Sequence, residues 1–215
     1  MLILRHSEVA QILDGRELDN IRTVADAYRL HAQGDTTVPH STFLRFPGQP
    51  RNRIIGLPAY RGGEQPAAGM KWIASFPANI ERSIERASAA ITLNSLETGR
   101  PEALLEGSLI SAKRTAASAA LAAELLTRDR RPDGIALIGC GIINLEILRH
   151  AVAALPGLRT VSLYDSSAER AAEFAERVAA VLPGAEVVVL DSAEHALAAH
   201  GLVPSRRPRS SRTWT

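Results

Sequence analysis

Residues 132–150 read PDGIALIGCGIINLEILRH, in which a glycine pair separates an apolar run from a helical pattern. The run GIALIGC predicts a buried strand, and IINLEILRHAVAAL predicts a helix. The alternation continues downstream, with strands predicted at TVSLYD and AEVVVLDS and helices at SSAERAAEFAERVAAVL and AEHALAAH. This β-α-β-α-β-α order predicts an α/β fold with a Rossmann-like parallel sheet, the first half of a doubly wound domain over residues 129–200.

The turn between the first strand and helix has the pattern G-x-G-x-x-N, from Gly139 and Gly141 to Asn144. The first glycine permits a tight turn, the second lets the backbone approach a pyrophosphate, and the helix N-terminus offers amide donors. Asp165, 26 residues after Gly139, ends the next predicted strand, where an acid accepts hydrogen bonds from ribose hydroxyls and disfavours a 2′-phosphate. The pattern predicts an NAD site; the alternative is a glycine turn in an α/β domain that binds no nucleotide.

The N-terminal half has an α+β pattern. Residues 7–33 show helical spacing of apolar residues with a break at Asp14-Gly15, which predicts two helices. The short runs STFLRF, RIIGLPAY, GMKWIASF, AAITLNS and EALLEGS predict the strands of a meander, with one partly helical connection at PANIERSIER. An alanine-rich helix is predicted at 111–128, and the charged, proline-containing stretch after it predicts a domain boundary between residues 128 and 129.

Composition and charge narrow the class of protein. The 215 residues are 46% hydrophobic and 22% charged, as in globular proteins, and no uncharged apolar stretch reaches the roughly 20 residues that span a bilayer. Four arginines and no acids in residues 201–215 predict a disordered basic tail, with a phosphate-binding arm as the alternative. The single cysteine, Cys140, excludes an internal disulfide and a thiolate metal cluster. Because the N-terminus lacks a signal-peptide pattern, we expect a cytoplasmic protein. We expect no nucleic-acid partner, because the basic residues are concentrated in the tail, and no membrane partner, because no stretch can span a bilayer.

A more specific indication comes from GMKWIASFPANIE, residues 69–81, and LEGSLISAKRTAASA, residues 105–119. With the sequence around them, they resemble the ornithine cyclodeaminase/mu-crystallin family over residues 1–198. Within it they are most similar to the dehydrogenases of 2,3-diaminopropionate biosynthesis that act on N-(2-amino-2-carboxyethyl)-L-glutamate. The resemblance implies a substrate-binding and dimerisation domain over residues 1–128, a homodimer, and NAD as cofactor. It also implies NAD-dependent oxidative hydrolysis to 2,3-diaminopropionate and 2-oxoglutarate, for siderophore or peptide antibiotic biosynthesis.

The resemblance also assigns candidate site residues. Lys71 falls on the family's substrate-binding lysine, a candidate catalytic residue, and Arg114 falls on its carboxylate-binding arginine; a guanidinium and an ammonium can grip one α-carboxylate. Arg86 stands where the cyclodeaminases have a cofactor-contacting threonine, which suits a substrate with more carboxylates than ornithine. The family's second carboxylate-binding arginine corresponds to Arg45 or Arg53. The family's NAD loop and ribose acid fall on Gly139, Gly141, Ile142, Ile143 and Asp165.

Alternatives stay open for these residues and for the function. Lys71 and Arg114 could both be solvated surface positions; we expect instead that they converge on one anionic site. After AEHALAAH the family continues into a fourth strand and an aspartate that handles a proton, whereas this sequence reads GLVPSRRPRSSRTWT, which predicts a shifted reading frame and a truncated family member. The alternative functions are an ornithine cyclodeaminase or imino-acid reductase, a ligand-binding protein without activity, and an inactive truncation product.

Overall fold

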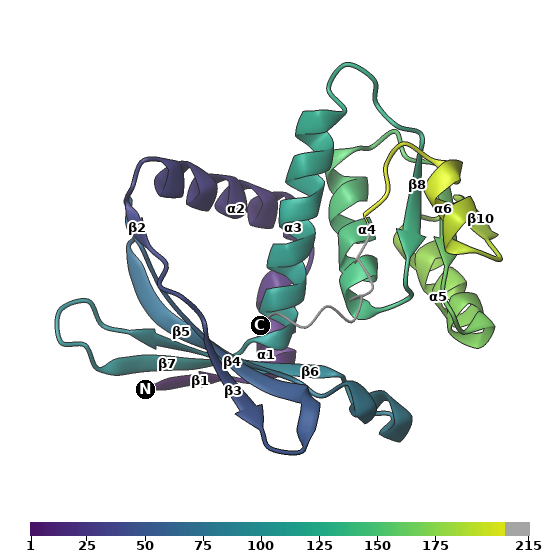
Figure 1. Cartoon of the computed structure of the whole chain (residues 1–215). Coiled ribbons are helices and arrows are strands. Elements are labelled where there is room, and N and C mark those ends of the chain that lie inside the picture. The colour runs from purple at the N-terminus through teal and green to yellow at the C-terminus, as the bar shows by residue number, and fades with distance from the viewer. Residues whose placement is uncertain (205–215) are drawn as a thin grey trace. The chain divides into compact units, whose positions relative to one another are not determined.

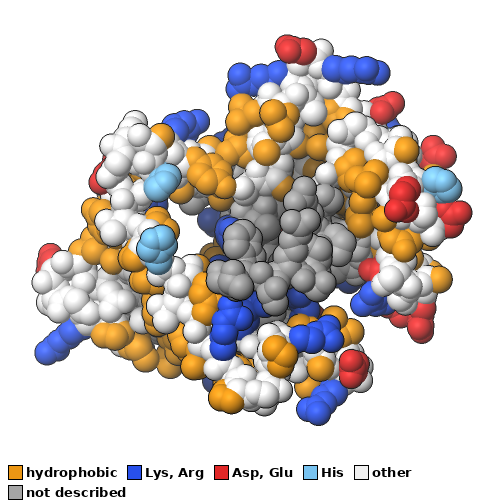
Figure 2. Space-filling model, in the orientation of Figure 1, with side chains coloured by type: hydrophobic (Ala, Val, Ile, Leu, Met, Phe, Trp, Pro, Cys, Tyr) orange, Lys and Arg blue, Asp and Glu red, His pale blue; other side chains and the backbone are white. Residues whose placement is uncertain are grey.

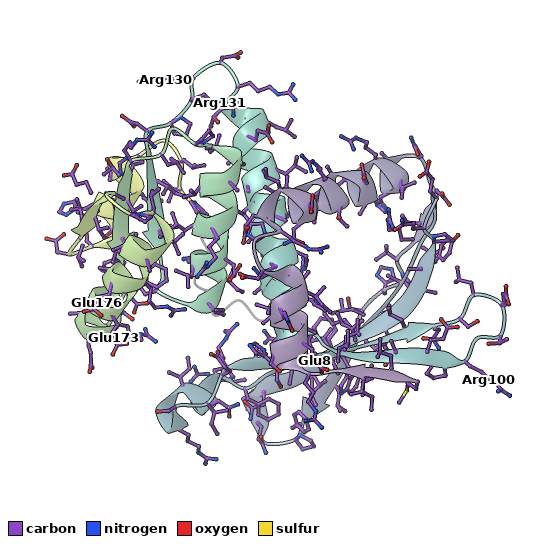
Figure 3. The ribbon with its side chains drawn as sticks, turned by 180° about the vertical axis from the view of Figure 1, so that it is seen from behind. Glu8, Arg100, Arg130, Arg131, Glu173 and Glu176 are labelled. Atoms are coloured by element: carbon purple, nitrogen blue, oxygen red, sulfur yellow. The ribbon has the colours of Figure 1, made fainter. Side chains whose placement is uncertain are left out.

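The computed structural model describes residues 1–204, which divide into two units, Met1–Arg114 and a second that begins at Thr115. The division falls inside helix α3 (Ser108–Leu126), earlier than the boundary at 128/129 that the sequence suggested. The predicted linker instead forms the loop after this helix, from which Arg130 and Arg131 extend in Figure 3. The arginines of the predicted basic tail lie outside the described residues.

Two helices open the first unit, as the spacing of apolar residues predicts. Helix α1 (His6–Leu13) and helix α2 (Glu17–Ala32) are separated at Gly15, whose φ of +65° is a left-handed conformation that glycine adopts without strain. Glu8 lies in the first turn of α1 (Figure 3), where its carboxylate accepts a hydrogen bond from the amide of Arg5 at 2.8 Å. Both predicted helices and the break between them are therefore confirmed.

The strands of the first unit form one sheet, with a meander at its centre (Figure 1). Within residues 1–204 its order is β1-β7-β6-β5-β4-β2, with β3 paired to β4. All pairs are antiparallel except β1 with β7, which is parallel. The strands are β1 (Leu2–Leu4), β2 (Thr36–Thr37), β3 (Thr42–Phe46), β4 (Gln49–Arg61), β5 (Ala67–Ser75), β6 (Ala87–Asn94) and β7 (Pro101–Glu106).

The meander prediction is confirmed, and the partly helical connection is the 3-10 helix η1 (Pro77–Arg82). The sequence did not indicate β1, because three residues are too few to show an alternating pattern. This strand forms through its tertiary pairing, in which Leu4 lies opposite Leu105 of β7.

The second unit alternates strands and helices in the order that the sequence predicts. Its strands pair in the order β10-β9-β8, all parallel, which is the order of the first half of a doubly wound sheet. Leu137, Leu163 and Phe174 are among the buried residues of its core. The elements are β8 (Gly134–Ile138), α4 (Ile142–Ala154), β9 (Thr160–Tyr164), α5 (Ala168–Val181), β10 (Glu186–Val189) and α6 (Ala193–Ala199).

The segment after α6 continues to follow the sheet. The carbonyl of Leu202 accepts a hydrogen bond from the amide of Ala136 in β8 at 3.0 Å, and the Leu202 side chain packs against the core. Residues 201–204, which the sequence assigned to the tail, therefore lie along β8 instead. No helix among the described residues is long and apolar enough to cross a membrane.

Glycine at position 69 is required by the close approach of β5 and β6. A Cβ built on Gly69 would lie 2.2 Å from the backbone oxygen of Thr92, whereas at Gly157 the nearest atom is 3.9 Å away. We expect Gly69→Ala to lower the free energy of unfolding of the first unit by about 1–3 kcal/mol, as other overpacking substitutions do. Urea unfolding measures it, with Gly157→Ala as the control. Equal effects of the two substitutions would contradict this packing.

Candidate functional site

The turn after β8 is shaped by its two glycines. Gly139 has a φ of +97°, which L side chains rarely adopt, and its amide donates to the carbonyl of Tyr164 at 2.8 Å. Gly141 has a φ of −104° and directly precedes α4, and a Cβ built there would meet no atom within 4 Å. Packing within the protein therefore does not require glycine at 141. The space beside this backbone is available to a ligand that approaches the N-terminus of α4, where Ile142 and Ile143 begin the helix.

Asn144 explains why the third small residue of the glycine pattern is absent. Its side-chain amide donates to the carbonyl of Ile138 at 2.9 Å and to that of Gly139 at 2.6 Å. The side chain is buried, so these two carbonyls depend on it rather than on water. Asn144 therefore holds the strand end and the turn together from the first turn of α4.

Asp165 connects the glycine turn to the neighbouring strand. It follows β9, and its carboxylate accepts hydrogen bonds from the amides of Cys140 at 2.8 Å and Ser167 at 3.0 Å, and from the guanidinium of Arg170 at 2.5 Å. Burial raises the pKa of this carboxyl, but the two amides and Arg170 outweigh burial and hold the pKa below its ordinary value. Asp165 is therefore ionised at neutral pH and lies beside the turn, where the sequence analysis expected the ribose acid.

Cys140 lies between the two glycines of the turn. Burial, followed by the Asp165 carboxylate, raises the pKa of its thiol to about 11 despite the opposing effect of Arg170. The thiol therefore stays protonated, and its side chain packs against the core of the second unit.

In the first unit, Lys71 occupies the middle of β5 and faces the start of α3. Its ammonium donates to the hydroxyl of Ser111 at 3.1 Å. The start of α3 is attached to the sheet, because Glu106 of β7 accepts from the amide of Ser108 at 2.5 Å and the Ser108 hydroxyl accepts from the amide of Ala89 at 2.9 Å. This attachment keeps the first turn of α3 over Lys71.

Arg114 follows Ser111 by three residues and therefore lies on the same side of α3. Burial and then the Arg114 guanidinium lower the pKa of Lys71 from 10.5 to about 8. Within residues 1–204, neither Lys71 nor Arg114 forms an ion pair with an acidic side chain. The first unit thus brings together two cations that act on one another, an arrangement suited to an anionic ligand.

The remaining predicted arginines are placed differently. Arg53 is half-buried on the same face of the sheet as Lys71, four positions along β4 from Leu57, the residue paired with Lys71. Arg45 pairs with Arg53 in register but is exposed, and its guanidinium lies 5.7 Å from the centre of the Phe43 ring. Arg53 is therefore the better candidate of the two.

Arg86 directly precedes β6, and its carbonyl accepts a hydrogen bond from the amide of Phe76 at 2.9 Å. It lies five positions from Ile91, which pairs with Lys71, so the backbone separates Arg86 from Lys71 by roughly 17 Å along the strand. The structure does not bring Arg86 next to the Lys71–Arg114 pair.

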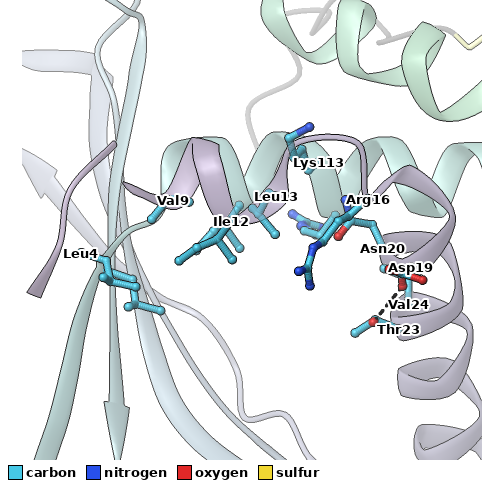
Figure 4. Close-up of a pocket in the computed structure, with 13 residues that line it drawn as sticks. Leu4, Val9, Ile12, Leu13, Arg16, Asp19, Asn20, Thr23, Val24 and Lys113 are labelled. Atoms are coloured by element: carbon cyan, nitrogen blue, oxygen red, sulfur yellow. Dashed lines mark hydrogen bonds between the residues drawn. The ribbon is translucent and has the colours of Figure 1, made fainter. Parts of the chain in front are cut away.

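A cavity of about 420 Å³ lies between the first helices and the sheet (Figure 4), and Arg114 is one of the residues that line it. One end is apolar, and at the other end Arg16, Asp19, Asn20 and Thr23 gather (Figure 4). Lys113 also lines it, with its ammonium 3.7 Å from the Glu17 carboxylate. The lining residues are Leu4, Val9, Ile12, Leu13, Arg16, Asp19, Asn20, Thr23, Val24, Leu105, Ile110, Lys113 and Arg114.

Three residues that contact the candidate sites had no role assigned from the sequence: Ser111, Asn144 and Arg170. Ser111 could have been found from its position one helical turn before Arg114. Asn144 had a signal, because it replaces the small third residue of the glycine pattern. Arg170 had none, because its contact with Asp165 depends on how α5 turns back toward the end of β9.

Comparison with known proteins defines the class to which this arrangement belongs. The model of the ornithine cyclodeaminase/mu-crystallin family matches residues 2–204. The chain is 33% identical, over 92% of its length, to the N-((2S)-2-amino-2-carboxyethyl)-L-glutamate dehydrogenase of Staphylococcus aureus. The chain belongs to the ornithine cyclodeaminase/mu-crystallin family, which confirms the resemblance seen in the sequence.

Solved structures agree with the fold. The Thermococcus litoralis Delta(1)-pyrroline-2-carboxylate reductase, in complex with NADH and L-proline, matches 91% of the chain with a TM-score of 0.83 and 28% identity. An archaeal alanine dehydrogenase dimer with bound NAD also matches 91%, with a TM-score of 0.79 and 28% identity. The chain spans 60% of the Staphylococcus aureus dehydrogenase, 58% of the reductase and 57% of the alanine dehydrogenase.

Titration of Lys71 tests the proximity of the two cations. Lys71 and Lys113 are the only lysines of the sequence, so labelling lysine Cε with carbon-13 gives two side-chain signals, which a Lys113→Arg variant assigns. We expect the Lys71 signal to titrate at about 8, and Arg114→Gln to raise the midpoint while burial keeps it below 10.5. The cost of burying charged Lys71 should accordingly be present below about pH 8 and disappear as the pH rises toward 10.5.

The control is Arg100→Gln, because Arg100 is exposed on the turn between β6 and β7 (Figure 3). This substitution should leave the Lys71 midpoint unchanged. A midpoint at 10.5 in the unsubstituted chain would show that Lys71 is solvated and that Arg114 does not influence it.

Proposed function

We propose that the chain takes part in the NAD-dependent oxidative hydrolysis of N-(2-amino-2-carboxyethyl)-L-glutamate to 2,3-diaminopropionate and 2-oxoglutarate. The observation that carries this proposal is the Lys71–Arg114 pair, because two neighbouring cations without an acidic partner among residues 1–204 suit a substrate with several carboxylates. The cavity that Arg114 lines is also lined by Arg16. The similarity to the Staphylococcus aureus dehydrogenase supports this substrate rather than a monocarboxylate.

The glycine turn supports NAD as the cofactor. The open space beside Gly141 fits the pyrophosphate at the N-terminus of α4, and the ionised Asp165 fits the adenine ribose. Two relatives of this fold were solved with NADH or NAD bound. When bound, NAD⁺ accepts the hydride that leaves the Cα of the glutamate portion.

The residues of the first unit supply binding and proton transfer in this proposal. Arg114 grips a substrate carboxylate through its planar guanidinium, which orients Cα for loss of its hydride. Loss of the hydride leaves a C=N bond, to which water adds before the C–N bond breaks. With a pKa of about 8, Lys71 can hold a carboxylate as the ammonium or, once deprotonated, accept a proton from the attacking water.

An assay that measures NADH and 2-oxoglutarate tests this function. We expect N-(2-amino-2-carboxyethyl)-L-glutamate and NAD⁺ to yield NADH and 2-oxoglutarate in equal amounts. The assay should use both the chain and a chimera that joins it to the C-terminal part of the Staphylococcus aureus relative beyond the 60% it spans. Arg114→Ala should lower kcat/KM by about 10- to 100-fold, the loss of a charge-assisted bidentate contact, whereas Arg100→Ala should not.

Other products would assign the chain to another activity. Proline and ammonia from ornithine, without 2-oxoglutarate from the glutamate adduct, would indicate a cyclodeaminase. Reduction of a cyclic imino acid by NADH would indicate a reductase like the Thermococcus litoralis protein. If neither the chain nor the chimera turns over any of these substrates, the enzymatic proposal is wrong.

The sheet of the first unit supports a homodimer in the same proposal. The face opposite Lys71 carries exposed apolar side chains from three strands: Ile3, Leu44, Met70 and Trp72. Hydrophobic side chains are exposed along these strands in Figure 2. An apolar patch of this kind is typical of an interface, and the related archaeal alanine dehydrogenase was solved as a dimer.

We place the homodimer in the cytoplasm, because the single cysteine allows no internal disulfide.

Light scattering after size-exclusion chromatography tests the dimer. We expect the chain to elute as a dimer and Trp72→Glu to elute as a monomer, because a charge at the centre of the apolar face would have to be desolvated on association. Leu197→Glu is the matched control, because Leu197 is exposed on α6 of the second unit. A folded Trp72→Glu dimer would rule out this face as the interface.

A further inference from the structure

Arg170 is held against the acid that the proposed cofactor needs. Ser167 precedes α5, and its hydroxyl accepts from the amide of Arg170 at 3.3 Å, which sets the first turn of the helix beside Asp165. The guanidinium of Arg170 then donates to Oδ1 of Asp165. The Arg170 side chain is 44% exposed and that of Asp165 only 8%. The arginine can therefore move toward solvent or a ligand, whereas the carboxylate cannot.

The hydrogen bonds of Asp165 leave too little room for a ribose. Oδ2 accepts from the amide of Cys140, and Oδ1 accepts from the amide of Ser167, from Arg170 and, at 3.4 Å, from the hydroxyl of Ser166. A carboxylate offers about four acceptor sites, so these four donors leave none for the two ribose hydroxyls. The two amides belong to the backbone of the turn and the helix start, and the contact of the exposed Ser166 hydroxyl is long. Arg170 is therefore the charged donor that a ribose with both hydroxyls would displace.

A 2′-phosphate would meet the same two residues differently. Paired with Arg170, Asp165 presents no net charge, so its repulsion of a phosphate is offset. An arginine guanidinium carries five donors and binds phosphate through two of them at once. On leaving Asp165, Arg170 would find a new partner in NADP(H) but none in NAD(H).

We propose that Arg170 is a specificity residue that weakens the preference of this site for NAD(H) over NADP(H). It does so by competing with the ribose hydroxyls for Asp165 and by offering its guanidinium to a 2′-phosphate. This inference rests on the proposed dinucleotide site at the glycine turn. It adds to that site a residue whose removal should make the cofactor preference sharper.

Fluorescence titration of the full chain with NADH and with NADPH tests the proposal. Arg170→Ala should tighten NADH binding severalfold and weaken NADPH binding, so that the ratio of the two dissociation constants changes by about tenfold or more, the effect expected for one charge-assisted hydrogen bond. Arg170→Lys keeps the positive charge but loses the two-pronged guanidinium, so its ratio of dissociation constants should fall between those of the unsubstituted chain and Arg170→Ala. The control is Arg177→Ala, which removes an exposed arginine of α5 whose guanidinium lies over the Phe174 ring. This substitution should leave the ratio of the two dissociation constants unchanged.

The outcomes separate this inference from the proposed function. If the chain and Arg177→Ala bind neither dinucleotide, the proposed cofactor site is wrong and the role of Arg170 falls with it. If NADH binds but Arg170→Ala leaves the ratio unchanged, the inference alone is wrong. Equal weakening of both ligands by Arg170→Ala would show that Arg170 only supports the fold of the turn, which also overturns the inference.

Discussion

The attachment of α3 to the first sheet is the constraint on which the candidate substrate site depends. Glu106 and Ser108 fix the first turn of the helix to β7 and β6, because their side chains accept hydrogen bonds from the backbone amides of Ser108 and Ala89. Ser111 is thereby held within hydrogen-bond distance of the Lys71 ammonium, and Arg114, one turn further, is held close enough to lower the pKa of Lys71. Two like charges in a partly buried place destabilise each other, which an anionic ligand would relieve.

The second unit holds a negative charge in place, the carboxylate of Asp165. The Asp165 carboxylate accepts hydrogen bonds from an amide of the glycine turn and from an amide at the start of α5. These bonds fix the position of the carboxylate relative to the glycine turn and to α5. Asn144 completes this arrangement by holding the end of β8 to α4. Each unit thus contains a charge that its own folding positions, a pair of cations in one and a single carboxylate in the other.

Much of the fold could be predicted from the sequence, because the order of strands and helices is set by local patterns of apolar residues and glycines. The alternating strands and helices after residue 133 and the break at Gly15 follow from apolar spacing and glycine. Strand β1 could not be predicted, because its three residues form a strand only through pairing with β7. The same holds for the contacts of Ser111 and Arg170, which depend on tertiary packing, and for Arg86, whose distance from Lys71 is set by strand register.

The most direct test of the central claim is the titration of carbon-13-labelled Lys71 in the presence of N-(2-amino-2-carboxyethyl)-L-glutamate. If a substrate carboxylate binds between Lys71 and Arg114, its negative charge should stabilise the ammonium and raise the midpoint above the value of about 8 in the chain alone. The same ligand should leave the Lys113 signal, already paired with Glu17, nearly unchanged. A Lys71 midpoint that stays the same or falls when the ligand is bound would contradict the assignment of these two cations to the substrate.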